Sequence, residues 1–235
     1  MKPSLRAISR GILIVLVPVV LILAAVRIVL HPWFLEFEYR TPGFPADSFG
    51  FSMEDRLNYS RVALEYLLND EDISFLAKQR FPAGEQVPYT SCTMMVDCNL
   101  MYNQRELRHM EDVKMVVQAA LTVWYGAMAV VLLAGIWAWR AGWLEDYRWA
   151  LARGGMLTVL LILGILLLVL AAFGFFFVAF HQVFFEADTW LFLWSDTLIR
   201  LFPERFWRDT FLVVGGISAL LGTLTWRVFK PRQAG

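Results

Sequence analysis

Charge is scarce in this 235-residue sequence: charged side chains make up 18% of it, and the formal net charge at pH 7 is zero. A chain without a basic excess is poorly suited to the phosphate backbone of nucleic acids, so we expect no nucleic-acid partner. Histidine and cysteine are scarcer still, with three and two residues. The first apolar stretch contains no cysteine that could form a lipobox, so we predict that the protein is not itself a lipoprotein.

Apolar residues, in contrast, make up 58% of the chain, and its mean hydropathy is +0.54, which is typical of an integral membrane protein. A helix needs about 20 apolar residues to cross the hydrocarbon core of a bilayer. Four segments approach or exceed this length, and they cover residues 11–30, 116–139, 154–180 and 210–228. Because helices satisfy their own backbone groups in lipid, we predict an all-α fold, a four-helix transmembrane bundle that forms a single membrane domain over residues 1–235.

Basic residues predict the orientation of these spans. The N-terminus, the loop between the second and third spans, and the C-terminus together carry nine lysines and arginines, against only Glu145 and Asp146. The positive-inside rule therefore places both termini in the cytoplasm. The first apolar stretch resembles a signal peptide, but Arg27 and the length of the apolar run favour an uncleaved anchor.

The two loops on the other side of the membrane have different patterns. Residues 31–115 have helical spacing in part, and we predict a small helical extracytoplasmic cap within the membrane domain. Residues 181–209 are rich in aromatic and aliphatic side chains, so we predict an outer interfacial helix. Asp196 and Arg200 are four residues apart and are expected to pair on this helix.

Cys92 and Cys98 lie in a turn-rich part of the cap. A close cysteine pair outside the cytoplasm usually forms a disulfide, so we predict a structural bridge. A redox-active pair is the alternative, but it would more often have the Cys-x-x-Cys spacing.

The stretch from Arg105 to Lys114 carries the candidate chemistry. It is rich in charge and leads directly into the second apolar segment. On a helix, His109 and Asp112 lie one turn apart, and Asp112 could hold the imidazole in one tautomer. The same spacing would let Arg108 reach Asp112 and Glu111 reach Lys114.

A second imidazole, His181, follows the third apolar segment at once. His109 and His181 are therefore expected at a similar depth on neighbouring helices. An imidazole can accept a proton near neutral pH, and Arg108 or Lys114 could stabilise an oxyanion. Spacing alone is not specific, because such residues on a solvated helix more often form plain polar surface.

Three motifs together resemble a known family. They are His109-Met-Glu-Asp-Val-Lys114, Phe180-His-Gln-Val-Phe-Phe185 and Asp196-Thr-Leu-Ile-Arg-Leu-Phe-Pro-Glu-Arg-Phe-Trp207. The sequence is similar over nearly its whole length to the bacterial four-span integral membrane family that includes the lipoprotein intramolecular transacylases. This resemblance implies an acyltransferase of the cytoplasmic membrane that moves an O-acyl chain of a diacylglyceryl cysteine to the α-amine of that cysteine, at the outer leaflet.

The resemblance also implies roles for individual residues. The paired functional histidines of the family fall on His109 and His181. We expect His109, supported by Asp112, as the base and His181 as the acid, and the reverse arrangement remains open. Diacylglyceryl-modified lipoproteins and membrane lipids are the expected partners, with no cofactor and no metal. Expected substrate-binding residues are Arg108, Lys114, Trp190, Asp196 and Arg200.

Other functions remain open at the level of sequence. Two histidines on neighbouring helices could ligate a b-type haem in an electron-transfer protein, although such ligands usually lie deeper in the membrane. A quinone-linked thiol oxidase would use Cys92 and Cys98. A non-catalytic accessory subunit of a membrane complex would need neither pair.

Overall fold

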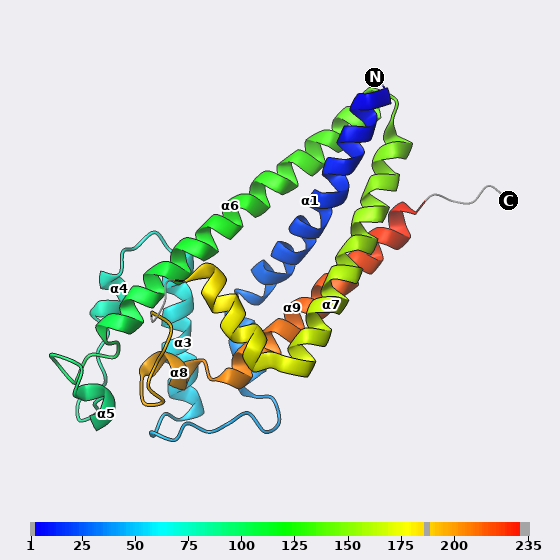
Figure 1. Cartoon of the computed structure of the whole chain (residues 1–235). Coiled ribbons are helices and arrows are strands. Elements are labelled where there is room, and N and C mark those ends of the chain that lie inside the picture. The colour runs from blue at the N-terminus through cyan, green and yellow to red at the C-terminus, as the bar shows by residue number, and fades with distance from the viewer. Residues whose placement is uncertain (1–2, 186–188, 231–235) are drawn as a thin grey trace. The chain divides into compact units, whose positions relative to one another are not determined.

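The computed structural model describes residues 3–185 and 189–230, and in these residues it has helices and no β-strand (Figure 1). The predicted all-α class is confirmed. The helices are α1 (Pro3–Val29), α2 (Pro32–Tyr39), α3 (Met53–Leu68), α4 (Ser74–Ala77), α5 (Tyr89–Cys92), α6 (Gln104–Arg140), α7 (Leu144–Phe184), α8 (Thr197–Leu201) and α9 (Glu204–Phe229).

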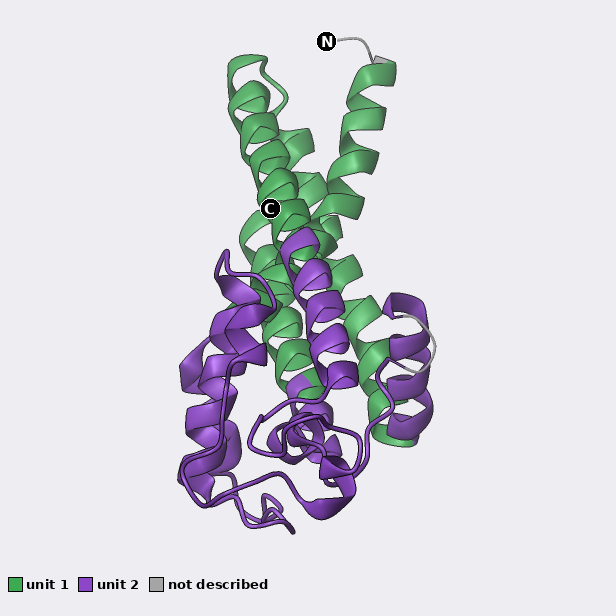
Figure 2. Ribbon diagram, turned by 90° about the vertical axis from the view of Figure 1, so that its left-hand side faces the viewer, with its two compact units in different colours: residues 1–29, 120–171, 211–235 green, residues 30–119, 172–210 purple. Residues whose placement is uncertain are grey.

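The chain forms two compact units (Figure 2), and the single membrane domain expected for residues 1–235 stays a prediction. Unit 1 comprises residues 1–29, 120–171 and 211–235. Unit 2 comprises residues 30–119 and 172–210. The cap predicted over residues 31–115 is therefore only part of a unit, because residues 172–210 complete it.

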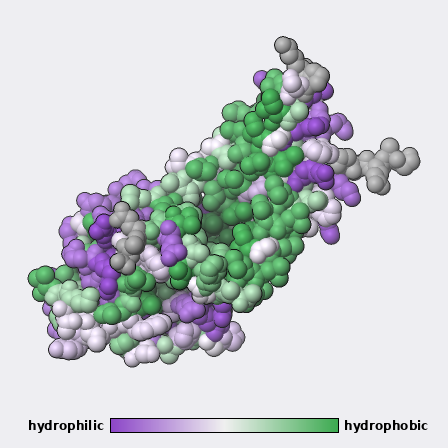
Figure 3. All heavy atoms as spheres, viewed as in Figure 1, coloured by the Kyte–Doolittle hydropathy of each residue, from purple (hydrophilic) through white to green (hydrophobic). Residues whose placement is uncertain are grey.

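Four helices are long and apolar enough to cross a membrane, as the sequence predicted: α1, α6, α7 and α9. Each of these helices contains nearly all of the apolar stretch that predicted it. In unit 1 they expose large aliphatic side chains such as Leu132, Leu133 and Leu167, which suits contact with lipid. Apolar residues cover the visible face of these helices, and hydrophilic residues gather at the end where the chain begins (Figure 3).

Glycines bring α7 and α9 together in unit 1. A Cβ atom added to Gly155 would lie 2.6 Å from the carbonyl oxygen of Gly222, and one added to Gly222 would lie 2.8 Å from that of Gly155. Real Cβ atoms do not approach backbone oxygens so closely. The two backbones therefore touch at a point where only glycine fits, which is the packing that small residues permit between membrane helices.

One end of unit 1 gathers the basic residues. Arg10 Nη1 donates to Asp146 Oδ1 at 3.1 Å, which joins the first turns of α1 to the first turn of α7. Arg148 Nη2 donates to the carbonyl oxygen of Val228 at 3.4 Å, which brings the end of α9 to the same place. The start of α1 and the connection between α6 and α7 share this end (Figure 1).

Helix α7, which contains the third predicted span at residues 154–180, is interrupted. Ala172 has φ −152° and ψ 57°, which is outside the helical region and marks a kink between two helical pieces. The boundary between the two units falls at this residue. Residues 173–184 form a separate helical piece that belongs to unit 2 and carries His181.

Unit 2 has its own hydrophobic core. Buried side chains from α3, α4, the loops that follow them and the start of α6 pack against α8. The members are Phe51, Ala63, Tyr66, Leu76, Phe81, Val87, Met101, Tyr102, Leu107, Met110, Leu198 and Leu201. The disulfide between Cys92 and Cys98, expected from the sequence, closes a loop at the edge of this core.

A single helix over residues 181–209 does not form, and the predicted interfacial location of this segment stays a prediction. Between the end of α7 and the start of α9 the described residues are extended or turning, apart from the five-residue helix α8. Leu198 and Leu201 of α8 are 5% and 0% exposed, so these two side chains enter the core of unit 2, whereas Leu191 and Trp194 are 48% and 73% exposed. A protein core can satisfy the polar groups of an irregular segment, which a bare lipid surface cannot.

The predicted pair between Asp196 and Arg200 does not form either. Asp196 precedes α8 with extended dihedral angles, so its side chain does not share a helical face with Arg200. Arg200 Nη2 instead lies 2.9 Å from Asp47 Oδ2, and Asp196 Oδ2 lies 3.3 Å from Arg105 Nη2.

Candidate active site

The first turn of α6 is fixed at both ends by Asn103 and Glu106. Asn103 Oδ1 accepts the N–H of Glu106 at 3.0 Å, and Glu106 Oε2 accepts the N–H of Asn103 at 2.9 Å, which together make a capping box. Glu106 Oε1 also accepts the N–H of Leu198 at 2.7 Å. His109 stands one turn further along α6, so a helix start tied to α8 sets its position.

The imidazole rings of His109 and His181 face each other. Their centroids are 6.2 Å apart with an angle of 18° between the planes, and each residue is 8% exposed. The two histidines are 72 positions apart in the sequence, on α6 and on the second piece of α7. The expected convergence of the two rings is therefore present within unit 2.

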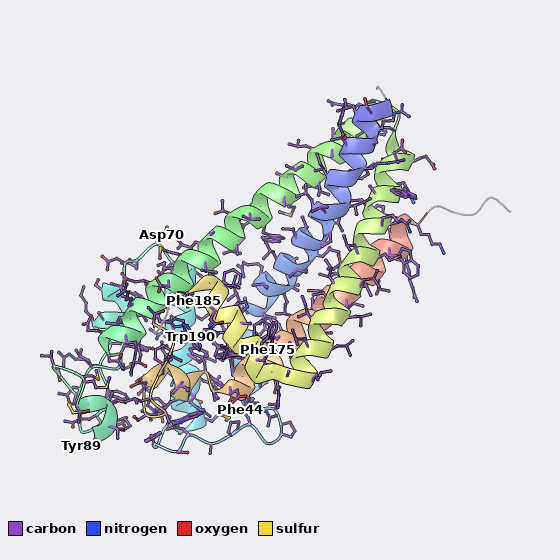
Figure 4. The ribbon with its side chains drawn as sticks, viewed as in Figure 1. Phe44, Asp70, Tyr89, Phe175, Phe185 and Trp190 are labelled. Atoms are coloured by element: carbon purple, nitrogen blue, oxygen red, sulfur yellow. A yellow bond between two sulfur atoms is a disulfide. The ribbon has the colours of Figure 1, made fainter. Side chains whose placement is uncertain are left out.

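Aromatic side chains enclose this pair. Phe185 lies 4.9 Å from the ring of His109 and 5.4 Å from that of His181, between ring centroids. Phe192 packs edge-on against His109 at 5.3 Å, and Trp190 lies 4.9 Å from His181. Figure 4 shows Phe185 and Trp190 close together beside α6. Trp190 was an expected site residue, and Phe185 ends the motif quoted around His181, although neither contact with the imidazoles was predicted. Phe192 had no signal beyond the density of aromatics after His181.

A backbone carbonyl fixes the tautomer of His181. Its Nδ1 lies 2.8 Å from the carbonyl oxygen of Phe177. A carbonyl oxygen can only accept, so Nδ1 must carry the hydrogen. In the neutral ring this leaves a lone pair on Nε2, which makes His181 ready to take a proton there.

His109 is held differently. Its Nδ1 is buried and has no hydrogen-bond partner in the described part of the chain. The bond from Asp112 to this nitrogen that would fix the tautomer is therefore absent. The His109 ring packs against Phe185 and Phe192, and these aromatic contacts orient it.

The other expected site residues lie at the border of the pair or away from it. Arg108 is exposed on α6 directly before His109. Lys114 is buried, donates from Nζ to Asn69 Oδ1 at 3.0 Å and to the carbonyl of Glu71, and lies 4.2 Å over the ring of Tyr66. Lys114 thus ties α6 to the turn after α3 rather than to Glu111.

Asp196 is an anchor for the segment that carries Trp190 and Phe192. It is 1% exposed, and its two oxygens accept from Leu193 N and Ser91 Oγ, each at 2.8 Å. Asn103 Nδ2 at 3.1 Å and Arg105 Nη2 at 3.3 Å also donate to it. Arg200 is 4% exposed and bound to Asp47. Asp196 and Arg200 therefore suit contacts that hold unit 2 together better than direct contacts with a substrate.

A model of one protein family matches residues 11–207, and its description is lipoprotein intramolecular transacylase Lit. The chain belongs to this family. A relative from Aquifex aeolicus (strain VF5), described only as an uncharacterized protein, is 29% identical over 220 residues, which are 94% of this chain and 92% of the relative.

Solved structures of a transacylase of this family share the fold. The membrane integral lipoprotein intramolecular transacylase Lit from Bacillus cereus matches with a TM-score of 0.65 and 17% identity, covering 97% of this chain and 96% of the other. A variant of that protein with one histidine changed to arginine matches with a TM-score of 0.70 and 16% identity, covering 97% and 91%. The family assignment favours the acyltransferase over the electron-transfer and accessory-subunit alternatives.

Proposed function

We propose that this membrane protein is a lipoprotein intramolecular transacylase that moves one O-acyl chain of a diacylglyceryl cysteine to the α-amine of the same cysteine at the outer leaflet. The product is a lyso-form lipoprotein. The observation that carries the proposal is the facing pair of buried imidazoles, 6.2 Å apart between ring centroids, in a chain of the transacylase family.

The proton balance of this reaction suits two imidazoles. An α-ammonium group loses two protons on its way to an amide, and the departing glyceryl oxygen regains one of them. The amine nitrogen forms a bond to the ester carbonyl carbon, and the bond from that carbon to the glyceryl oxygen breaks. Two bases within reach of one another can take both protons, and one of the resulting imidazolium rings can return a proton to the leaving oxygen.

His181 fits the role of first base better than His109, which favours the second of the two arrangements that the sequence left open. The bond of His181 Nδ1 to the carbonyl of Phe177 keeps the lone pair of a neutral ring on Nε2, and it can stabilise the imidazolium that forms. His109 then takes the second proton or hands one to the glyceryl oxygen. Because amine and ester belong to one molecule, proximity supplies a further part of the rate.

The aromatic enclosure supports a lipid substrate. Phe185, Phe192 and Trp190 leave the imidazoles little contact with water, and such rings can pack along an acyl chain. Low water content also protects the ester from hydrolysis, which would release a fatty acid instead of forming the amide.

The proposal is tested by mass spectrometry of lipoproteins from cells that lack the gene and carry wild-type, H109A, H181A or H31N proteins. We expect lyso-form lipoproteins, with an acylated α-amine, from wild type and from H31N. His31 is the exposed cap of α2, and asparagine preserves the capping function, so H31N is a matched control. Each of the two alanine variants should lower the N-acylated fraction by about 10²-fold or more.

Wild-type cells whose lipoproteins all keep a free α-amine would refute the proposed activity. Equal N-acylation in wild type, H109A and H181A would refute the role of the histidine pair while leaving the activity itself in place.

A further inference from the structure

The indole nitrogen of Trp190 has no partner among the described residues, although it is buried. Indole N–H is a donor and cannot accept. Most buried polar groups in native proteins are hydrogen-bonded, and an exception at a site of chemistry calls for an explanation such as a bond made only with substrate.

The place of this donor is informative. The Trp190 ring lies 4.9 Å from the ring of His181, between centroids, and the unpartnered Nδ1 of His109 belongs to the facing ring. Two unsatisfied polar atoms thus occur on side chains that both neighbour His181. Phe185 and Phe192 pack around His109, and the imidazole of His181 lies next to Trp190, yet neither of the two buried atoms forms a hydrogen bond.

The segment that carries this donor is fixed in place by contacts within the protein. Asp196 accepts the N–H of Leu193, three residues after Trp190, and Phe192 is packed on His109. Asp196 itself is bound by Asn103 and Arg105 at the start of α6, the helix that carries His109. A donor fixed in this way needs little rearrangement when charge develops nearby, which is the condition for strong electrostatic stabilisation of a transition state.

We propose that Trp190 donates its indole N–H to the carbonyl oxygen of the ester under attack and stabilises the oxyanion of the tetrahedral intermediate. This inference rests on the proposed transacylation. When the amine nitrogen bonds to the carbonyl carbon, the π electrons of the carbonyl move to its oxygen, and that oxygen receives the indole hydrogen bond. When the bond to the glyceryl oxygen breaks, the electrons return and the carbonyl of the new amide forms.

The test uses full-length protein in detergent micelles and a synthetic diacylglyceryl lipopeptide whose conversion to the N-acylated lyso form is followed by mass spectrometry. Trp190→Phe removes the N–H and part of the ring. Replacement of Trp190 by 3-benzothienylalanine keeps the size of the indole and exchanges the N–H for sulfur. Trp194→Phe is the matched control, because Trp194 belongs to the same segment and is 73% exposed.

We expect both changes at Trp190 to lower kcat by about 10²-fold with KM changed less than about threefold, because the bond gains strength only in the transition state. W194F should keep the kcat and KM of wild type. A packing role would instead leave the benzothienyl variant active, since that side chain fills the same space.

Wild-type kcat in the benzothienyl variant would overturn the inference, as would a loss confined to KM. A wild-type protein that converts no lipopeptide would refute the proposed transacylation, and the inference would fall with it. An active wild type with an equally active benzothienyl variant would refute only the role of the indole.

Discussion

The guanidinium of Arg200 lies inside unit 2, where it is 4% exposed and stands 3.4 Å from the centroid of the Phe51 ring. Its partner Asp47 also accepts the N–H groups of Phe51 and Phe49, at 2.8 Å and 3.1 Å. The main-chain oxygen of Arg200 is bound in turn by Arg56. The charge of Arg200 thus lies in the interior of unit 2 where several hydrogen bonds and a carboxylate compensate it.

Loss of one member of this pair should be costly. D47A leaves the buried guanidinium of Arg200 without its carboxylate, and we expect the free energy of unfolding to fall by about 3–5 kcal/mol. D97A removes the partner of Arg80 in an ion pair at the surface of the same unit and should change stability little. Thermal unfolding in detergent compares the two variants, and equal transition temperatures would contradict this ranking.

The same pair makes stability depend on pH. Burial alone would raise the pKa of Asp47, but the hydrogen bonds from Arg200 and from the backbone of Phe51 outweigh it and lower the pKa below its ordinary value. The stabilisation from ionised Asp47 is therefore present above the pKa of an unfolded aspartate, about 4, and is lost as the pH falls through the lower pKa of the folded state.

At the scale of whole elements, close contacts that reach the backbone decide how helices pair. The approach of α7 to α9 depends on Gly155 and Gly222, and the approach of α6 to α8 depends on Glu106, whose carboxylate accepts the N–H of Leu198. The first contact organises unit 1, and the second organises the region of unit 2 where His109 stands.

The contact in unit 1 can be tested by two substitutions in α9. G222A places a Cβ atom 2.8 Å from a backbone oxygen of α7, so it should separate the helices and lower the unfolding temperature. G216A meets no atom within 4 Å and adds a better helix former, so stability should stay equal or rise slightly. A G222A protein that unfolds at the wild-type temperature would show that the helices do not need this approach.

For the molecule as a whole, the distribution of charge predicts the orientation in the membrane. Basic residues gather at the end of unit 1 where α1 begins and α9 ends, and their ion pairs and hydrogen bonds, such as that between Arg10 and Asp146, hold this end together. The cytoplasmic location of both termini remains a prediction from the positive-inside rule.

Fusions to alkaline phosphatase test this orientation, because the enzyme needs disulfides that form only outside the cytoplasm. A fusion after Phe229 at the end of α9 should be inactive. Insertion at Val96, an exposed residue of the disulfide loop, should give an active enzyme. The opposite pattern would reverse the topology and put the proposed reaction on the cytoplasmic leaflet.

Sequence patterns were sufficient wherever the determining interactions are local or repeat along the chain. Long apolar runs predicted the four spanning helices. The close cysteine pair in the predicted cap indicated a disulfide. The motifs around His109 and His181 indicated the family.

Only the tertiary structure decided the environment of the site. The partners of Arg200, Asp196 and Lys114 come from distant segments, so spacing along the chain misassigned them to neighbours four or three residues away. Helical spacing likewise suggested Asp112 behind His109, whereas the ring is held by aromatic side chains from the other end of the sequence. Apolar periodicity indicates which face of a segment contacts lipid or a protein core. A buried polar group, in contrast, pairs with the complementary group that folding brings within about 3 Å, and no local sequence pattern encodes that partner.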